Sequence, residues 1–284
     1  MKLVIGAANF TQKYGLENSK IPSVNNLKKI LAFCKLKNIN MIDDALEYGN
    51  SKKIYKKINL KNFKLITKIK LPKNYRSIKD LNNYYLKILY NDLEKAGKKN
   101  YSHLLAHEIY DDQTKNKILV DSLKFLKKKR LTKKIGVSAY NPMEVRKILK
   151  IWKPEIIQLP FNVFDQRLIK SKIIDHLYKK KIEIHVRSIF LQGALLEDRT
   201  PKKLMKYDKY FRNWHNWCTK NNINKLYACI HFIEKFNKIS AIVVGINNLT
   251  QLKEITGFIK KKKIKISYKN FSNNKILVDP RKWN

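Results

Sequence analysis

The sequence contains little cysteine, and what it has excludes two kinds of site. Its three cysteines, Cys34, Cys218 and Cys229, are an odd number, and their spacing matches no zinc or redox motif. Such sparing use of cysteine is typical of a protein kept in a reducing compartment. The sequence therefore predicts a cytoplasmic protein without a disulfide framework.

Long apolar runs are also absent. The N-terminal segment MKLVIGAANF has too short an apolar stretch for a secretory signal. No segment approaches the roughly 18 apolar residues that a membrane-spanning helix needs. No stretch rich in proline, glycine and serine divides the chain, so we expect one domain. Hydrophobic residues still make up 44% of the 284 residues, which is enough for a substantial core.

Acidic residues are scarce beside basic ones. The chain has 62 Lys and Arg against 22 Asp and Glu, a formal net charge of +40. Such a field attracts nucleic acid or anionic membranes. The lysines, however, are spread along the whole chain, and the basic runs at 127–130 and 260–265 have no interleaved aromatic residues for base stacking. We predict a solvated basic surface and no specific nucleic-acid partner, with an anion-binding surface as the alternative.

Three catalytic signatures are missing as well. None of the eight glycines forms the phosphate-binding loop G-x-G-x-x-G, which argues against a doubly wound open sheet. The nucleophile elbow G-x-S-x-G is absent. His103 and His107 have no acidic or cysteine partner at metal-ligand spacing beyond Glu108, so we predict no metal site.

Eight short apolar runs, rich in β-branched residues, recur along the chain. Their length is typical of buried parallel strands. Amphipathic stretches with helical spacing lie between them, which predicts an α/β fold, a single-domain (β/α)8 TIM barrel. A doubly wound sheet, or one run that is a buried helix, are the alternatives. The runs are Lys2–Gly6, Ile39–Asp43, Lys64–Lys68, Ser102–His107, Lys133–Ser138, Glu155–Leu159, Ile182–Arg187 and Ser240–Gly245.

Polar or special residues stand at the ends of seven of these runs. The carboxyl ends of barrel strands converge on one face, where catalytic groups sit. Any one of these residues alone is more often an ordinary strand-end residue, but their joint occurrence indicates a site. They are Asp43, Lys68, His107, Ser138, Gln158, Arg187 and Gly245.

The residue types near Asp43 fit one kind of chemistry. Tyr48 follows five positions later, and a phenol has a reference pKa near 10. A cation such as Lys68 would lower that pKa, and Asp43 would supply the counter-charge of a buried lysine. His107 could orient a carbonyl by hydrogen bonding. Together these groups suit a carbonyl that is protonated while its carbon is attacked.

Seven segments, in order, resemble signatures of the aldo/keto reductase family, and of a bacterial branch of it. The resemblance extends from Met1 to about Ile259. It implies a (β/α)8 barrel that binds NADP(H), or less often NAD(H), without a Rossmann domain. The segments are MIDDALEYGNS, KLITKIK, HLLAHE, IGVSAY, IIQLPFNVFDQR, IHVRSIFLQGALL and AIVVGINNLTQLKE.

The resemblance also implies a role for each matching residue. Tyr48 is the general acid, Lys68 and Asp43 tune it, and His107 positions the substrate carbonyl. Ser138 and Gln158 match positions that hold the nicotinamide carboxamide, and the position of Arg187 normally faces the nicotinamide ring. Ser188 and Gln192 match the pyrophosphate grip. The adenosine end is matched by Gly245, Asn247, Gln251 and Glu254.

Several positions depart from the family pattern. Arg187 replaces an aromatic residue that usually stacks on the nicotinamide, and we expect its flat guanidinium to stack there and to favour the reduced cofactor. A phosphate or substrate-anion clamp is the alternative role. Gln251 stands where an Arg would indicate a 2′-phosphate, so Lys253 is the nearest basic candidate. The remaining departures are Asp44, Ala139 and Ile255.

Two aromatic segments are candidates for the substrate pocket. The tail at 265–284 carries Tyr268 and Trp283, and residues 210–218 carry Trp214 and Trp217. For both segments, packing against the barrel is the alternative. The function predicted from the resemblance is the NADP(H)-dependent reduction of an aldehyde or ketone, with sugar and nucleotide-sugar carbonyls among the candidates. A catalytically silent barrel used for binding or regulation is the alternative.

Overall fold

The computed structural model describes residues 1–10, 12–13, 15–16, 21–48, 51–259, 266–272 and 274–283. The basic run at 260–265 lies outside the described residues. Within the described part, every helix is too short or too polar to cross a membrane.

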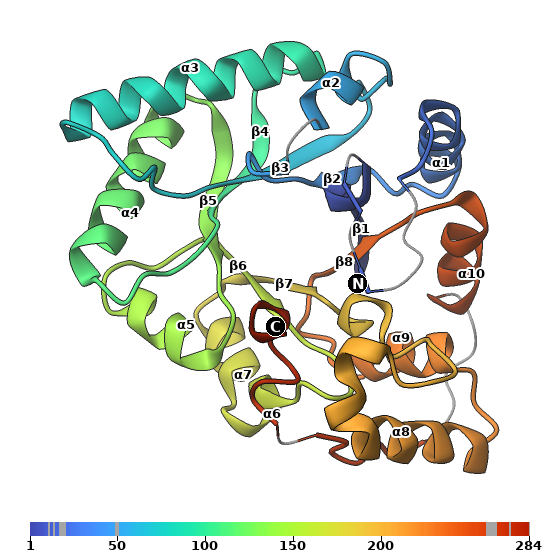
Figure 1. Ribbon diagram of the computed structural model, residues 1–284. Helices are drawn as coiled ribbons and strands as arrows, with labels where there is room; N and C mark the ends of the chain where they lie inside the picture. The colour runs from blue at the N-terminus through green and yellow to red at the C-terminus, as the bar shows by residue number, and fades with distance from the viewer. Residues whose placement is uncertain are drawn as a thin grey trace.

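Eight parallel strands close into a barrel in sequence order, and helices surround them (Figure 1). β1 pairs with β2 on one side and with β8 on the other, where Gly6 lies opposite Gly245. The predicted (β/α)8 barrel is therefore confirmed, and the predicted strand limits are right to within two residues. The strands are β1 (Lys2–Gly6), β2 (Met41–Asp43), β3 (Lys64–Ile69), β4 (Tyr101–Ala106), β5 (Thr132–Ser138), β6 (Ile156–Pro160), β7 (Glu183–Arg187) and β8 (Ala241–Gly245).

The helices cover the barrel because each buries an apolar face. At the start of α1, the Ser23 hydroxyl oxygen accepts a hydrogen bond from the backbone N–H of Asn26. Leu27, Ile30 and Cys34 of this helix face inward. The helices are α1 (Val24–Leu36), α2 (Ser51–Tyr55), α3 (Ile78–Ala96), α4 (Gln113–Lys128), α5 (Pro142–Leu149), α6 (Arg167–Lys170), α7 (Ile173–Lys179), α8 (Asp208–Lys220), α9 (Lys225–Glu234) and α10 (Leu249–Ile259). Short 3₁₀ turns are η1 (Ala7–Phe10), η2 (Leu191–Gly193), η3 (Lys202–Tyr207) and η4 (Pro280–Lys282).

The aromatic residues of α8 belong to the core. Trp214 is fully buried, and its indole N–H donates to the Leu195 carbonyl at 3.0 Å. Its ring stacks on Trp217, with centroids 5.5 Å apart, and meets Phe271 edge-on at 5.0 Å. The packing alternative for this segment is therefore the correct one.

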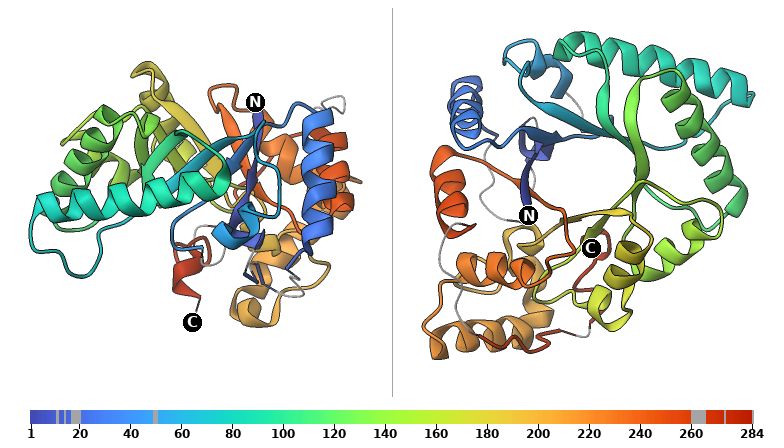
Figure 2. Two further views of the ribbon diagram at one scale, coloured as in Figure 1. Left: turned by 90° about the horizontal axis from the view of Figure 1, so that it is seen from above. Right: turned by 180° about the vertical axis from the view of Figure 1, so that it is seen from behind.

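The C-terminal segment crosses the helix layer and ends at the face where the strands terminate. Tyr268 packs on Trp217 and donates a hydrogen bond to the Ala228 carbonyl at 2.9 Å. The end of the chain lies opposite the N-terminus along the barrel (Figure 2, left). There, the Arg281 guanidinium lies 3.4 Å from the centroid of the Tyr140 ring, just beyond β5. The tail thus reaches the predicted catalytic face through Arg281.

Gly136 in β5 offers a test of the barrel packing. A Cβ at this position would lie 2.0 Å from the Ile156 carbonyl oxygen of the neighbouring strand β6. We expect Gly136→Ala to lower the free energy of unfolding by about 1–3 kcal/mol, because the backbone must shift. Urea unfolding monitored by tryptophan fluorescence measures this loss.

Gly257→Ala is the matched control. Gly257 is exposed in α10, and a Cβ there would meet no atom within 4 Å. In a helix, alanine is favoured over glycine by roughly 0.5–1 kcal/mol, so this variant should gain stability. Equal effects of the two substitutions would contradict the strand packing described.

Candidate active site

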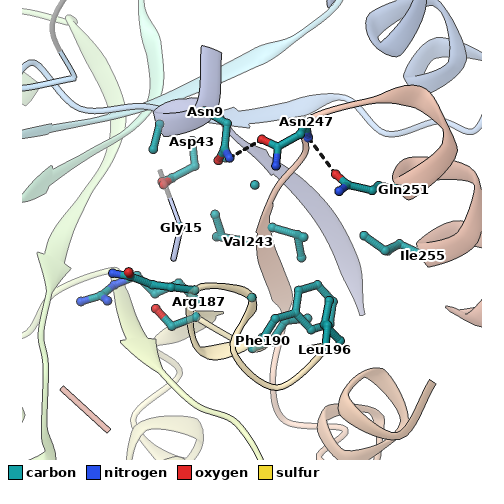
Figure 3. Close-up of a pocket in the computed structure, with 18 of the residues that line it drawn as sticks. Asn9, Gly15, Asp43, Arg187, Phe190, Leu196, Val243, Asn247, Gln251 and Ile255 are labelled. Atoms are coloured by element: carbon teal, nitrogen blue, oxygen red, sulfur yellow. Dashed lines mark hydrogen bonds between the residues drawn. The ribbon is translucent and has the colours of Figure 1, made fainter. Parts of the chain in front are cut away.

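A cavity of about 320 Å³ opens at the carboxyl ends of β1, β2, β7 and β8 (Figure 3). Gly6 and Asn9 contribute from the first strand and its 3₁₀ turn, and Phe190 and Leu196 add an apolar wall. Neither Tyr268 nor Trp283 is among the residues that line it. Nine of the predicted site residues do line it: Asp43, Tyr48, Arg187, Ser188, Gln192, Gly245, Asn247, Gln251 and Glu254.

Asp43 is the most connected group of the site. The Lys68 ammonium donates to one of its carboxylate oxygens at 2.5 Å, and the Gln158 amide donates to the other at 3.0 Å. All three residues are at most 4% exposed. Lys68 also donates to the Asp44 carbonyl at 3.0 Å. Because a buried charge needs such partners, Asp43 and Lys68 hold each other in place.

Tyr48 and His107 lie beside this ion pair. The Lys68 nitrogen is 5.6 Å from the centroid of the Tyr48 ring, and the His107 ring meets the Tyr48 ring edge-on at 6.0 Å. The structure therefore brings together all four residues that the sequence predicts to be catalytic. The site lies at the strand ends because β2, β3 and β4 end beside one another.

Sequence reasoning did not identify Glu47 as part of this group. Its carboxylate lies 2.6 Å from Nδ1 of His107. Burial raises the pKa of Glu47, but the hydrogen bond and charge of His107 outweigh burial and leave it below the ordinary value. The carboxylate thus stays ionised and binds an Nδ1–H, which leaves Nε2 to face a ligand.

Ser138 and Gln158 lie behind the cavity rather than on its wall. They are opposite each other in the β5–β6 pair, and both are at most 1% exposed. Oε1 of Gln158 is buried and has no hydrogen-bond partner in the described part of the chain. A buried acceptor without a donor is costly, so this oxygen is suited to accept a hydrogen bond from a ligand amide.

On the opposite side of the cavity, hydrogen bonds link η1, which follows β1, to the segment after β8. The Asn9 amide donates to the Asn247 side chain at 2.6 Å, and the Asn247 backbone N–H donates to Gln251 at 2.9 Å (Figure 3). A Cβ on Gly245 would lie 2.2 Å from Oδ1 of Asn9. Glycine at the end of β8 is therefore what allows Asn9 to approach.

The loop after β7 has an unusual backbone. Ser188, Leu191 and Gln192 all have positive φ, at 57°, 48° and 57°. Each such non-glycine residue costs about 1–3 kcal/mol and is typical of functional loops. The Asn162 amide, which donates to the Ser188 carbonyl at 2.9 Å, helps to fix the loop. Left-handed residues turn backbone N–H groups to one side, an arrangement that binds anions.

Arg187 does not point along the cavity toward Gln251. Its guanidinium lies 4.3 Å from the centroid of the Tyr140 ring and donates to the Ala139 carbonyl at 3.4 Å. The sequence gave no sign of this partner, because Tyr140 follows β5 and Arg187 ends β7. The expected stacking on a nicotinamide ring stays a prediction.

A buried cluster of acids and phenols lies beneath the catalytic group. Tyr55 donates a short hydrogen bond to Asp44, and Tyr101 donates to Asp92 at 2.5 Å. Burial raises the pKa of Asp44 from 3.8 to about 6, although the Tyr55 hydrogen bond opposes this rise. The departure at Asp44 is thus explained by its own phenolic partner.

Asp44 gives the fold a defined dependence on pH. Because its folded-state pKa exceeds its unfolded value, its stabilising contribution is complete below about pH 4 and is lost as the pH rises through about 6. The loss amounts to about 3 kcal/mol. Asp44→Asn keeps the acceptor for Tyr55 and cannot ionise. Relative to wild type, its free energy of unfolding should therefore rise by about this amount between pH 4 and pH 8.

Chemical unfolding of both proteins across this pH range measures the difference. Asp111→Asn is the control, since Asp111 is fully exposed and forms a surface ion pair with Lys147. That variant should stay close to wild type at every pH. A pH-independent difference between Asp44→Asn and wild type would show that the pKa of Asp44 is the same in the folded and the unfolded protein.

The fold has counterparts among known proteins. A comparison with curated proteins gives no matching sequence. Among solved structures, an aldo-keto reductase from Bacillus halodurans matches with a TM-score of 0.72 and 13% identity, over 93% of this chain and 88% of that one. A glycerol dehydrogenase from Gluconobacter oxydans matches with a TM-score of 0.69 and 18% identity, over 93% and 87%. At such identities the likeness shows a shared fold.

The family comparison covers nearly the entire chain. The model of the aldo/keto reductase family, a family of oxidoreductases, matches residues 2–272. This range includes every strand of the barrel and all of the predicted site residues. The chain belongs to the aldo/keto reductase family.

Proposed function

We propose that this protein reduces an aldehyde or ketone to an alcohol with NADPH, and that Tyr48 donates the proton. The observation that carries the proposal is the convergence of Tyr48, the buried Asp43–Lys68 pair and His107. A catalytically silent barrel would have no need for a buried ion pair beside a phenol and an imidazole.

The side chains divide the chemistry between them. Lys68 places a positive charge beside Tyr48, and this charge stabilises the phenolate that remains after proton donation. Asp43 keeps the lysine charged and oriented. His107, held at Nδ1 by Glu47, presents its other nitrogen to the substrate carbonyl. The substrate oxygen would thus be polarised from two directions.

Several features of the cavity suit a nicotinamide dinucleotide. Oε1 of Gln158 is a buried acceptor for a carboxamide, with Ser138 beside it. Ser188 and Gln192, on the loop with positive φ, would hold the pyrophosphate. When bound, the reduced nicotinamide would supply the hydride. Toward the adenosine end, the cavity is lined by Gly245, Asn247, Gln251 and Glu254.

The preference between NADPH and NADH depends on the residues near α10. Oε1 of Gln251 accepts a hydrogen bond from the Asn247 backbone, and this neutral side chain lacks the positive charge that a 2′-phosphate favours. Lys253 is exposed on the same helix and is the basic candidate for that role. Fluorescence titration with NADPH and NADH, followed by turnover assays with aldehydes and keto-sugars, tests the proposal. A protein that binds neither cofactor would contradict it.

Tyr48→Phe removes the proton donor and keeps the ring. We expect turnover to fall by roughly 10²–10⁴, the usual contribution of a general acid. Affinity for NADPH should hardly change. Steady-state kinetics and fluorescence titration measure the two effects separately, and near-normal turnover would exclude Tyr48 as the acid.

Lys68→Met removes the cation beside the phenol. The pH–rate profile of the residual activity should move to higher pH, because the phenolate loses its stabilising charge. The variant leaves Asp43 buried with only Gln158 as partner, so the free energy of unfolding should fall by about 3–5 kcal/mol.

Lys70→Met is the matched control for this prediction. Lys70 follows the same strand but is exposed. It should leave both the pH–rate profile and the unfolding curve close to those of wild type. A Lys68→Met variant that behaves like this control would contradict the coupling.

A further inference from the structure

Arg187 lines the cavity, and in the part of the chain that the structure describes no carboxylate forms an ion pair with it. Two other arginines lie in the same corner of the barrel, and each forms a bidentate ion pair. Arg167 pairs with Asp165, and Arg281 pairs with Asp279. Among the described residues, Arg187 makes one long hydrogen bond, to a backbone carbonyl, although a guanidinium carries five N–H donors.

A second guanidinium, that of Arg281, lies close to Arg187 and has its own carboxylate partner. The guanidiniums of Arg187 and Arg281 both lie on the ring of Tyr140, at 4.3 and 3.4 Å from its centroid. They are therefore closer together than a Debye length, about 8 Å at physiological ionic strength, and repel each other. Glu144 lies 3.9 Å from Arg281 and accepts the Tyr140 backbone N–H. An incoming anion would relieve this repulsion.

The position of Arg187 separates it from the adenosine end of the cavity. Asp43 and Arg187 lie on one side of the cavity, and Gln251 and Ile255 lie on the other (Figure 3). The guanidinium points away from the second side, toward Tyr140. An anion bound there would lie on the same side of the cavity as Asp43, whose partner Lys68 lies beside Tyr48, the proposed proton donor.

We propose that Arg187 binds the anionic group of the substrate, a carboxylate or a phosphate, while the carbonyl of the same molecule lies at Tyr48 and His107. The inference rests on the proposed reductase function and narrows its substrate to carbonyl compounds that carry negative charge. The planar fork of Arg187 matches both anions, because each can accept two parallel N–H bonds. Tyr140 holds the fork flat and half-buried, where an ion pair is screened less than at the surface.

The role in substrate binding differs from stacking on the cofactor. The flat face of Arg187 already covers Tyr140. An oxidised nicotinamide is itself a cation, so stacking would bring like charges together. A substrate anion would instead provide the Arg187 guanidinium with a partner of opposite charge. Loss of Arg187 should therefore affect neutral and anionic substrates equally if it binds the cofactor, and mainly anionic substrates if it binds the substrate anion.

The test compares paired aldehydes with saturating NADPH. The pairs are butanal with 4-oxobutanoate, and glyceraldehyde with glyceraldehyde 3-phosphate. In each pair the first aldehyde is neutral and the second carries an anionic group, a carboxylate or a phosphate. In the wild type, kcat/KM should be higher for the anionic member of at least one pair. That pair shows whether the site prefers a carboxylate or a phosphate. Arg187→Gln should lower kcat/KM for that member by about 10- to 100-fold, the usual effect of losing a charged hydrogen bond.

Two further variants sharpen the test. Arg187→Lys keeps the charge and loses the fork, so it should recover part of the loss. Arg212→Gln is the control, because Arg212 is 72% exposed in its side chain, pairs with Asp208 and lies outside the cavity. An equal loss for neutral and anionic aldehydes in Arg187→Gln, with weaker NADPH binding, would make Arg187 a cofactor residue and overturn the inference. Equal wild-type rates for both members of each pair would also overturn it.

Calorimetric titration with succinate and with inorganic phosphate separates this inference from the proposed reaction. Binding to the wild type that is lost in Arg187→Gln would support the anion site even if no aldehyde is turned over. In that case only the proposed reductase function would fail. The absence of binding of both anions to the wild type, with NADPH present, would overturn the anion site.

Discussion

The buried ion pair between Lys68 and Asp43 is the interaction on which the rest of the site depends. Neither charge is stable inside a barrel alone, so the two side chains must meet, and their strands must end in register. Gln158 takes the second carboxylate oxygen and thereby ties β6 to β2 across the barrel interior. This arrangement fixes the electrostatic surroundings of Tyr48 before any ligand binds, and such preorganisation is the source of most enzymatic stabilisation of charge.

Two further carboxyl groups, those of Asp44 and Glu47, lie near this pair, and their pKa values are shifted in opposite directions. Below it, Asp44 is buried against Tyr55 and holds a proton more readily than an exposed carboxyl does. Above it, Glu47 is held ionised by His107. Asp44 and Glu47, three positions apart, therefore have opposite tendencies, because one faces a phenol in the core and the other faces an imidazole at the cavity. Environment, and not residue type, assigns their roles.

The strands and their polar end residues could be predicted because they depend on local pattern. Apolar runs bounded by polar residues define strands, and the barrel topology brings their ends together without further information. The contacts of Glu47, Tyr140 and Arg281 could not be predicted in this way. Each joins residues from different strand–helix units, and side-chain direction decides the pairing: Glu47 meets His107, and Arg281 from the tail meets Tyr140. Such contacts are specified by packing of the whole chain.

The high positive charge of the chain and the cluster around Arg187 are two different properties. Most of the lysines are spread over the surface, where ion pairs contribute little. Arg187 is distinguished by being half-buried and by facing a cavity rather than solvent. A diffuse positive field raises the local concentration of anionic ligands, whereas a fixed guanidinium selects among them. The overall charge would therefore speed the capture of a dinucleotide and an anionic carbonyl compound, and the geometry at Tyr140 would determine which compound is turned over.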